Sequence, residues 1–231
     1  MFKMKIGIIG AMEVEVDGLR QCMEQGRTER ISGIDYHCGT ICGREVVVAQ
    51  SGVGKVNAAI CAQTMILRFQ PDVVINSGVA GGHHSLQIGD IVVASAVVEH
   101  DMDTSPLGDP KGYISGLGLV QMPADASVAR TLCAASEKLG HCKFGVIASG
   151  DQFISSRAQA DRIHREFGAY AYEMEGAAIG HVCCRSGVPF GILRVISDNG
   201  DEQAIVDFPT FVGEAAAKSI KVIVDFLNHL D

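Results

Sequence analysis

Two carboxylates stand one residue apart, at Glu173 and Glu175, where an apolar stretch ending at Tyr172 gives way to a segment rich in glycine and alanine. In an extended chain alternate side chains share a face, so both acids would point the same way. Ligands of open α/β sheets bind at the carboxyl ends of the strands, which favours a binding site here. The alternative is that one acid starts a helix and the other is merely solvated. Two more acids in similar settings, Glu15 and Asp198, favour the site.

The elements that must position these acids alternate along the chain. Short apolar runs predict buried strands, at residues 5–9, 72–76, 88–94, 144–148, 169–172 and 190–196. A hairpin is expected from residues 34–42 and 46–50. Helical patterns fill the intervals, at residues 13–22, 55–70, 124–139, 156–167, 176–186 and 208–227. Because no linker or repeat interrupts them, residues 1–231 are expected to form one domain of the α/β class, with helices flanking a largely buried central sheet.

Composition and charge restrict the kinds of partner. With 231 residues, of which 47% are hydrophobic and 20% charged, the chain can bury a sizeable core. The net charge of −8 argues against nucleic acid or an anionic membrane as a partner, since both need a basic surface. No apolar run reaches the roughly 18 residues that span a bilayer, and residues 1–6 lead straight into a strand rather than a secretory signal. A cytoplasmic location is therefore expected, with the eight cysteines reduced.

Three sets of residues resemble metal ligands, and none is predicted to bind a metal. Cys38 and Cys42 have a C-x₃-C spacing, but no second pair of ligands follows at a zinc-site interval. His83 and His84 are adjacent, which makes it difficult for both to face one ion, and the sequence shows no complementary cluster. The acids within residues 101–103 lack one too, so polar loop residues are the preferred interpretation.

Two glycine-containing turns resemble phosphate-binding loops without matching them. Residues 7–11 follow a strand, but they lack the G-x-G-x-x-G spacing of a dinucleotide site. Residues 52–55 end in a lysine, yet Val56 stands where a P-loop needs a hydroxyl to hold magnesium. Neither a dinucleotide nor a nucleoside triphosphate is therefore expected as a ligand.

Two further segments are predicted to take part in binding. Residues 77–82 read as a glycine-dense turn that lets the backbone approach a ligand. Residues 100–123 form a polar, irregular stretch with three prolines and four glycines. So long a loop inside a compact domain is usually a lid or a contact with a partner.

The strand-end acids and their apolar neighbours predict the ligand's chemistry. Several carboxylates, a few apolar walls and no cationic cluster suit an uncharged ligand that carries hydroxyl groups. Carboxylates accept hydrogen bonds from sugar diols, and an aromatic ring can pack on a flat base. The apolar residues expected beside the acids are Met12, Val53, Phe153, Ile154, Met174 and Phe208.

Taken together, these motifs resemble the bacterial 5′-methylthioadenosine/S-adenosylhomocysteine nucleosidases, over nearly the whole chain and in the right order. The matching segments are Gly7-Ile8-Ile9-Gly10-Ala11-Met12-Glu13-Val14-Glu15, Ser51-Gly52-Val53-Gly54-Lys55-Val56, Ser149-Gly150-Asp151-Gln152-Phe153-Ile154, Glu173-Met174-Glu175-Gly176 and Arg194-Val195-Ile196-Ser197-Asp198. The resemblance implies a nucleoside phosphorylase-like fold, a three-layer single domain with a central twisted mixed sheet. It also implies a homodimer, adenine nucleosides as substrates and no cofactor.

The resemblance also implies a role for each matching residue. Asp198 corresponds to the general acid that protonates adenine N7. Glu15 corresponds to the residue that activates the attacking water, helped by Arg194. Glu175 and Met174 correspond to the ribose contacts. Phe153 and Ile154 correspond to the adenine contacts. The 5′-thio substituent is expected to contact Met12, Val53, Phe208 and the partner chain's Leu107. The other implied pocket residues are Val79, Ala80, Gly81 and Glu173.

Three features depart from the family pattern, and other functions stay open. Val79 stands where a small polar residue is expected, Pro209 follows Phe208 where an acid is common, and residues 100–123 match poorly. These departures concern preference for the 5′ substituent. The alternatives are hydrolysis of aminodeoxyfutalosine, a phosphate-dependent purine nucleoside phosphorylase, or a nucleoside-binding protein without activity. A phosphorylase would need arginines around an anion site near Gly10 and Gly81, where the sequence has none.

Overall fold

The protein, described here from a computed structural model, folds around one mixed sheet of ten strands. The structure describes residues 4–230. The strands are β1 (Lys5–Gly10), β2 (Glu24–Ile31), β3 (Ile34–Ile41), β4 (Arg44–Gln50), β5 (Val73–Gly82), β6 (Ile91–Glu99), β7 (Met122–Pro123), β8 (Cys142–Ser149), β9 (Ala169–Glu173) and β10 (Phe190–Asp198). The helices are α1 (Glu13–Gln21), α2 (Lys55–Phe69), α3 (Ala126–Glu137), α4 (Arg157–Phe167), α5 (Gly176–Ser186) and α6 (Ala204–His229).

Part of the sheet closes into a ring. Strand β5 pairs with both β10 and β9, and β10 continues through β6 and β8 back to β9. The β10–β5, β6–β8 and β8–β9 pairs are parallel, whereas β10–β6 and β5–β9 are antiparallel. On the other side of β5 the order is β1, β4, β3 and β2. The expected twisted mixed sheet is confirmed, and its closure brings the ends of β5, β9 and β10 together.

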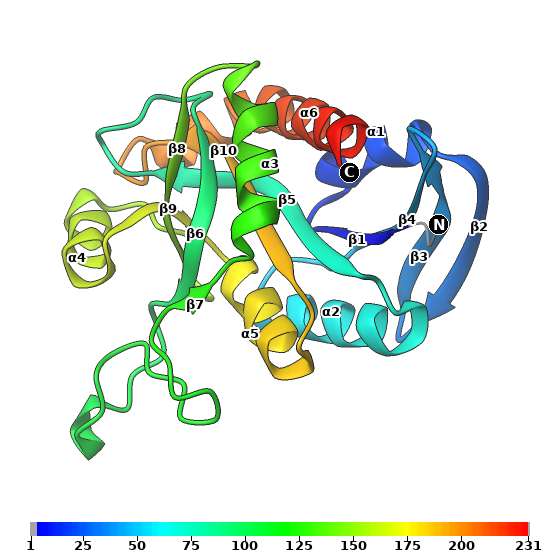
Figure 1. The fold of residues 1–231 in the computed structure, drawn as a ribbon. Helices are drawn as coiled ribbons and strands as arrows, with labels where there is room; N and C mark the ends of the chain where they lie inside the picture. The colour runs from blue at the N-terminus through cyan, green and yellow to red at the C-terminus, as the bar shows by residue number, and fades with distance from the viewer. Residues whose placement is uncertain (1–3, 231) are drawn as a thin grey trace.

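Helices cover both faces of the sheet (Figure 1). On one face α1, α3 and α6 pack over a core that includes Val16, Leu132 and Phe226. On the other face α2 and α5 pack against each other over Met65 and Ile179. Helix α4 lies outside β8 and β9 over a smaller cluster. These three layers confirm the predicted α/β architecture. None of the helices in residues 4–230 is both long and apolar enough to cross a membrane.

The structure differs from the sequence prediction at two strands, and the first difference affects the site. Strand β5 runs on to Gly82, so residues 77–82 are not a turn. The chain stays extended there because β10 pairs along this stretch and β9 pairs with Gly81 and Gly82. Strand β2 is missing from the sequence prediction because it is an exposed edge strand, Glu24–Ile31, without an apolar alternation.

The long polar segment between β6 and α3 is largely irregular, as expected. It contains a short 3₁₀ helix, η1 (Ser105–Leu107), a bridge between Ile114 and Leu119, and strand β7. Figure 1 shows it extending away from the sheet, with η1 at its far end. Leu107 is 84% exposed in the single chain.

Candidate active site

A cavity opens where β5, β9 and β10 end, and most of the predicted site residues line it. It contains about 530 Å³ of empty space, part of it open to solvent. Its lining residues are Ala11, Met12, Glu15, Val53, Val79, Ala80, Gly81, Phe153, Tyr172, Glu173, Met174, Glu175, Ser197, Asp198 and Phe208.

Glu15 enters the cavity from the first turn of α1 and is held by backbone amides. Its Oε2 accepts hydrogen bonds from the N–H groups of Ala11 and Met12, at 2.7 and 2.9 Å, and Oε1 accepts one from Val79 at 3.0 Å. Burial raises the pKa of this carboxyl, against the opposing effects of Arg194 and the three amides. A carboxylate so fixed and so desolvated is a stronger base than an exposed glutamate.

Glu173, which lines the cavity, forms a buried ion pair with Arg194, which lies behind the lining. The Arg194 Nη2 donates to Glu173 Oε2, and it also donates to the side chain of Asn76. Burial alone would raise the pKa of Glu173, but Arg194, the Ser149 hydroxyl and the Gly176 amide together hold it below the ordinary value. Both residues are almost fully buried, so this pair is a fixed part of the site.

The carboxylate of Glu173 also starts helix α5. Its Oε2 accepts from the amides of Glu175 and Gly176, at 3.0 and 2.7 Å, and the Ser149 hydroxyl donates to Oε1. Negative charge is favourable at a helix N-terminus. Glu173 is therefore the helix-start acid considered as an alternative for one member of the pair. Its carboxylate oxygens accept hydrogen bonds from groups of the protein itself.

Glu175 is the less satisfied acid of the pair. Its Oε1 accepts from the Gly54 amide at 2.9 Å, and its Oε2 lies 3.9 Å from Arg194 Nη2. Burial raises the pKa of Glu175 to about 7, and the neighbouring Glu173 and Glu15 carboxylates contribute in the same direction. Three carboxylates thus share one guanidinium, which leaves excess negative charge on this side of the cavity.

Asp198 occupies the end of β10, beyond an irregularity in the ladder with β5. Such irregularities re-aim a side chain at the edge of a sheet. The Gly200 amide donates to Oδ1 and the Ser197 hydroxyl to Oδ2, each at 3.0 Å. Burial raises the pKa of Asp198, with smaller contributions from Asp207 and Asp201 that also raise it. The protonated form is therefore more accessible than in an exposed aspartate.

Apolar side chains complete the lining of the cavity. Phe153 and Phe208 meet edge to face, with ring centroids 5.6 Å apart and planes at 78°. Phe153 comes from the loop before α4 and Phe208 from the first turns of α6, so two distant segments build one aromatic wall. Phe153 keeps 46% of its surface exposed, which leaves its ring free to pack against a planar ligand.

Three predicted site residues lie outside the cavity lining. Arg194 acts from beneath it through the two glutamates. The side chain of Ile154 packs into the α4 cluster, so its backbone is the part nearest to Phe153. Leu107 lies on the extended loop and is not among the residues that line the cavity of its own chain.

The predicted site does not include three of the lining residues, Ala11, Tyr172 and Ser197. Each adjoins a predicted residue. Tyr172 precedes Glu173 at the end of β9, and Ser197 precedes Asp198 in one of the quoted motifs. Position next to a strand-end acid is the signal that would have found them.

Comparison with known proteins identifies the family of this chain. The family model described as the Phosphorylase superfamily matches residues 5–228. The 5′-methylthioadenosine/S-adenosylhomocysteine nucleosidase of Bacillus thuringiensis (strain Al Hakam) is 39% identical over 231 residues, which cover 98% of this chain and 100% of that protein. The chain belongs to this nucleosidase family. As a member it is an enzyme, a hydrolase of N-glycosidic bonds.

Two solved structures of similar proteins also match the fold of this nucleosidase. The Neisseria meningitidis enzyme of the same name, in complex with methylthio-immucillin-A, has a TM-score of 0.94 at 33% identity and covers 98% of this chain and 99% of its own. The futalosine hydrolase of Helicobacter pylori strain 26695 has a TM-score of 0.93 at 36% identity and covers 98% of each chain. Both structures share the nucleoside phosphorylase-like fold expected from the sequence.

Proposed function

We propose that the protein hydrolyses the N-glycosidic bond of 5′-methylthioadenosine and S-adenosylhomocysteine, releasing adenine and the 5-thio-substituted ribose. The observation that carries this proposal is the pairing of two buried acids in one cavity, Asp198 and Glu15, whose pKa values are both raised. They come from opposite ends of the chain and offer one acid and one base to the same ligand. Residues 1–231 act in this proposal as a single nucleosidase domain.

Asp198 serves as the general acid in the proposed reaction. Breaking the bond leaves negative charge on adenine unless a proton arrives at N7. A raised pKa favours the carboxylic acid form that delivers this proton. Positioned acids typically contribute about 10²–10⁴-fold to a rate. The Gly200 and Ser197 donors fix the orientation of the carboxyl group.

Glu15 activates the attacking water. The three backbone amides on its carboxylate leave the group oriented toward the cavity, where it can accept a proton from water. Burial raises the pKa of Glu15, and the positive charge of Arg194, held by Glu173, opposes that effect and favours the ionised form. The developing positive charge on the ribose is stabilised by the excess of carboxylates around this arginine.

The remaining contacts follow from the walls of the cavity. Glu175 accepts hydrogen bonds from the ribose hydroxyls, with Met174 beside the sugar. Phe153 stacks on adenine, and the backbone of Ile154 pairs with its edge. The 5′-thio substituent lies among Met12, Val53 and Phe208, with Leu107 added by the partner subunit of a homodimer. The reaction as proposed needs no cofactor, and the proposed location is the cytoplasm.

A second candidate is hydrolysis of aminodeoxyfutalosine, which is also an adenine nucleoside. It is favoured by the similarity to the Helicobacter pylori futalosine hydrolase. The same acid and base would serve, because the difference between the substrates lies in the 5′ group. Phosphorolysis is disfavoured by charge. At about 4 Å and an effective dielectric near 20, phosphate and each carboxylate would repel by roughly 4 kcal/mol.

The experiment is adenine release from 5′-methylthioadenosine, S-adenosylhomocysteine and aminodeoxyfutalosine in phosphate-free buffer, repeated with added phosphate. Equal rates in both buffers, with a free 5-thio-substituted ribose identified by mass, are the expected result. Glu15→Gln should lower the rate without creating phosphate dependence. A strict phosphate requirement with a ribose 1-phosphate product would overturn the hydrolase proposal, and preference for aminodeoxyfutalosine would favour the second candidate.

A further inference from the structure

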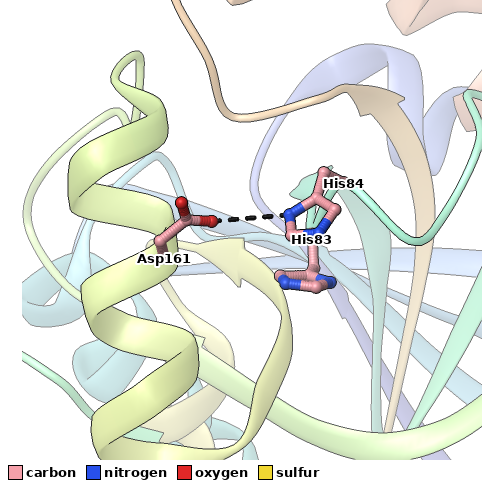
Figure 2. A group of neighbouring side chains, drawn as sticks. All are labelled: His83, His84 and Asp161. Atoms are coloured by element: carbon pink, nitrogen blue, oxygen red, sulfur yellow. Dashed lines mark ion pairs between the residues drawn. The ribbon is translucent and has the colours of Figure 1, made fainter.

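Two histidines and an aspartate converge outside the active-site cavity. His83 and His84 follow directly after β5, and Asp161 lies on α4. One potential ligand atom from each lies within 4.8 Å of the others. Figure 2 shows the Asp161 carboxylate directed from the helix toward the two imidazole rings, with a dashed line to His84.

The expectation that this histidine pair lacks a complementary group is wrong. The chain leaves the extended conformation at His83, and a turn closes when the Leu86 amide donates to the His83 carbonyl at 2.8 Å. Side-chain alternation ends there, so the two rings can lie on the same side, with centroids 4.0 Å apart. The carboxylate comes from a helix far along the sequence, which no local spacing could reveal.

The buried histidine is suited to donate a lone pair. His83 is only 7% exposed, so protein atoms rather than water surround most of its imidazole ring. Its Nδ1 lies 2.9 Å from the Ser85 hydroxyl and 3.3 Å from the Ser85 amide nitrogen. When Nε2 binds an ion, Nδ1 carries the proton and donates it to the hydroxyl oxygen, as the second ring nitrogen of a metal-bound histidine does.

Neighbouring rings fix the orientation of His83. His164 stacks on it with centroids 3.9 Å apart and planes at 22°, and Tyr170 meets it edge on at 6.0 Å. His164 is itself anchored, because its Nδ1 donates to the Ala169 carbonyl at 2.9 Å. Preorganised side chains lose little conformational entropy when they bind an ion.

We propose that His83, His84 and Asp161 bind a divalent transition-metal ion of the Zn²⁺ or Co²⁺ type. In a tetrahedral zinc site with bonds of about 2.0 Å, ligand atoms lie roughly 3.3 Å apart. The His84 Nδ1 and Asp161 Oδ1 atoms are already 3.4 Å apart. Two imidazoles and one carboxylate favour such ions over Mg²⁺ or Ca²⁺, which prefer oxygen ligands.

The site is accessible and lies close to the cavity without belonging to it. The side chains of His84 and Asp161 are 50% and 33% exposed, so an ion can enter and water can complete its coordination. A bound ion would tie the end of β5 to α4. Tyr172, which lines the active-site cavity, donates to the carbonyl of Ala160 next to Asp161. The ion is therefore assigned a stabilising role beside the active site, independent of the proposed reaction.

The test uses tag-free, chelator-treated and fully reduced protein, titrated with Zn²⁺ and Co²⁺ by calorimetry and absorption. One equivalent of either ion should bind. A hundredfold excess of Zn²⁺ over its dissociation constant should raise the unfolding midpoint by roughly 5–10 °C. His84→Ala and Asp161→Asn should each weaken binding at least about tenfold. His141→Ala, which removes an exposed histidine elsewhere, should bind like the parent.

The Co²⁺ spectrum separates this site from the cysteines. Binding at His83, His84 and Asp161 should give visible bands without thiolate-to-metal charge transfer. Circular dichroism and adenine release establish that the two variants are folded. Absence of binding by the parent, unchanged affinity in both variants, or a thiolate charge-transfer band as the main signal would each overturn the proposal.

Discussion

Gly81 on β5 and Asp198 on β10 are paired across the parallel ladder so closely that a β-carbon on Gly81 would lie 2.8 Å from Asp198 Oδ1. Real β-carbons essentially never approach another heavy atom so closely. The carboxyl group of the proposed acid thus occupies space that is available only because residue 81 is glycine.

Gly81→Ala should therefore displace the Asp198 carboxyl group. We expect adenine release to fall by at least about tenfold, because small misplacements of a catalytic group are costly. The parent and variant should be compared by steady-state kinetics and by circular dichroism. The matched control is Gly213→Ala in α6, where a β-carbon meets nothing within 4 Å. Equal activity of Gly81→Ala and the parent would contradict this account.

Asp198→Asn tests the acid directly. The amide fills the same space and can still accept from Gly200, but it cannot deliver a proton as the carboxylic acid can. Adenine release should fall by about 10²–10⁴-fold, while an adenine nucleoside analogue still binds. Asp225→Asn, at an exposed ion pair with Lys138, is the control and should retain activity. Turnover within tenfold of the parent would remove Asp198 from the proposed role.

Glu173→Ala should destabilise the fold more than it alters ligand contacts. It would leave the buried Arg194 without its main partner and remove the acceptor for two α5 amides. Breaking a buried ion pair costs about 3–5 kcal/mol of unfolding free energy. Glu29→Ala breaks a more exposed pair with Arg68 and should cost about 1 kcal/mol or less. Urea unfolding of both variants gives the comparison, and equal losses would show that the buried pair has no special role.

Glu175 gives stability a defined pH dependence. Its folded-state pKa, about 7, lies above the ordinary 4.5, so the folded protein holds this proton more tightly than the unfolded chain. The stability that comes from this tighter proton binding is fully present below pH 4.5 and is lost as pH rises through about 7. The effect of Glu175→Gln on the free energy of unfolding should therefore be more stabilising at pH 8 than at pH 5. The two effects should differ by on the order of 1–3 kcal/mol. A pH-independent difference in urea unfolding would contradict the raised pKa.

Leu107 tests whether the extended loop completes a neighbouring site. Leu107 is 84% exposed in the single chain, and in the proposed homodimer it is covered by the second subunit. Leu107→Ser should raise KM for 5′-methylthioadenosine severalfold, whereas Leu139→Ser, at a less exposed position after α3, should not. Sedimentation should show a dimer at micromolar concentration. A fully active monomer would exclude the partner contribution.

Much of the site was predictable because its acids mark strand ends. Glu15, Glu173, Glu175 and Asp198 each stand beside an apolar run, and the rule that ligands bind at the carboxyl ends of strands places them together. The apolar walls were predictable for the same reason. The order of the motifs along the chain identified the family, because several linked motifs rarely occur together by chance.

The sequence by itself determined the α/β class, the strand-end acids and the family. Only the tertiary structure decided that β5 continues through Gly82 and that Asp161 lies beside the two histidines. It also decided that Glu173 binds Arg194 and the first amides of α5, whereas Glu175 has fewer hydrogen-bond donors around it. The physical reason is that local patterns report which residues are buried, whereas hydrogen-bond partners and pKa shifts depend on groups brought close by the closed sheet. Glu173 and Glu175 are near neighbours in sequence, yet Ser149 and Gly54, from two distant segments, help to give them different states.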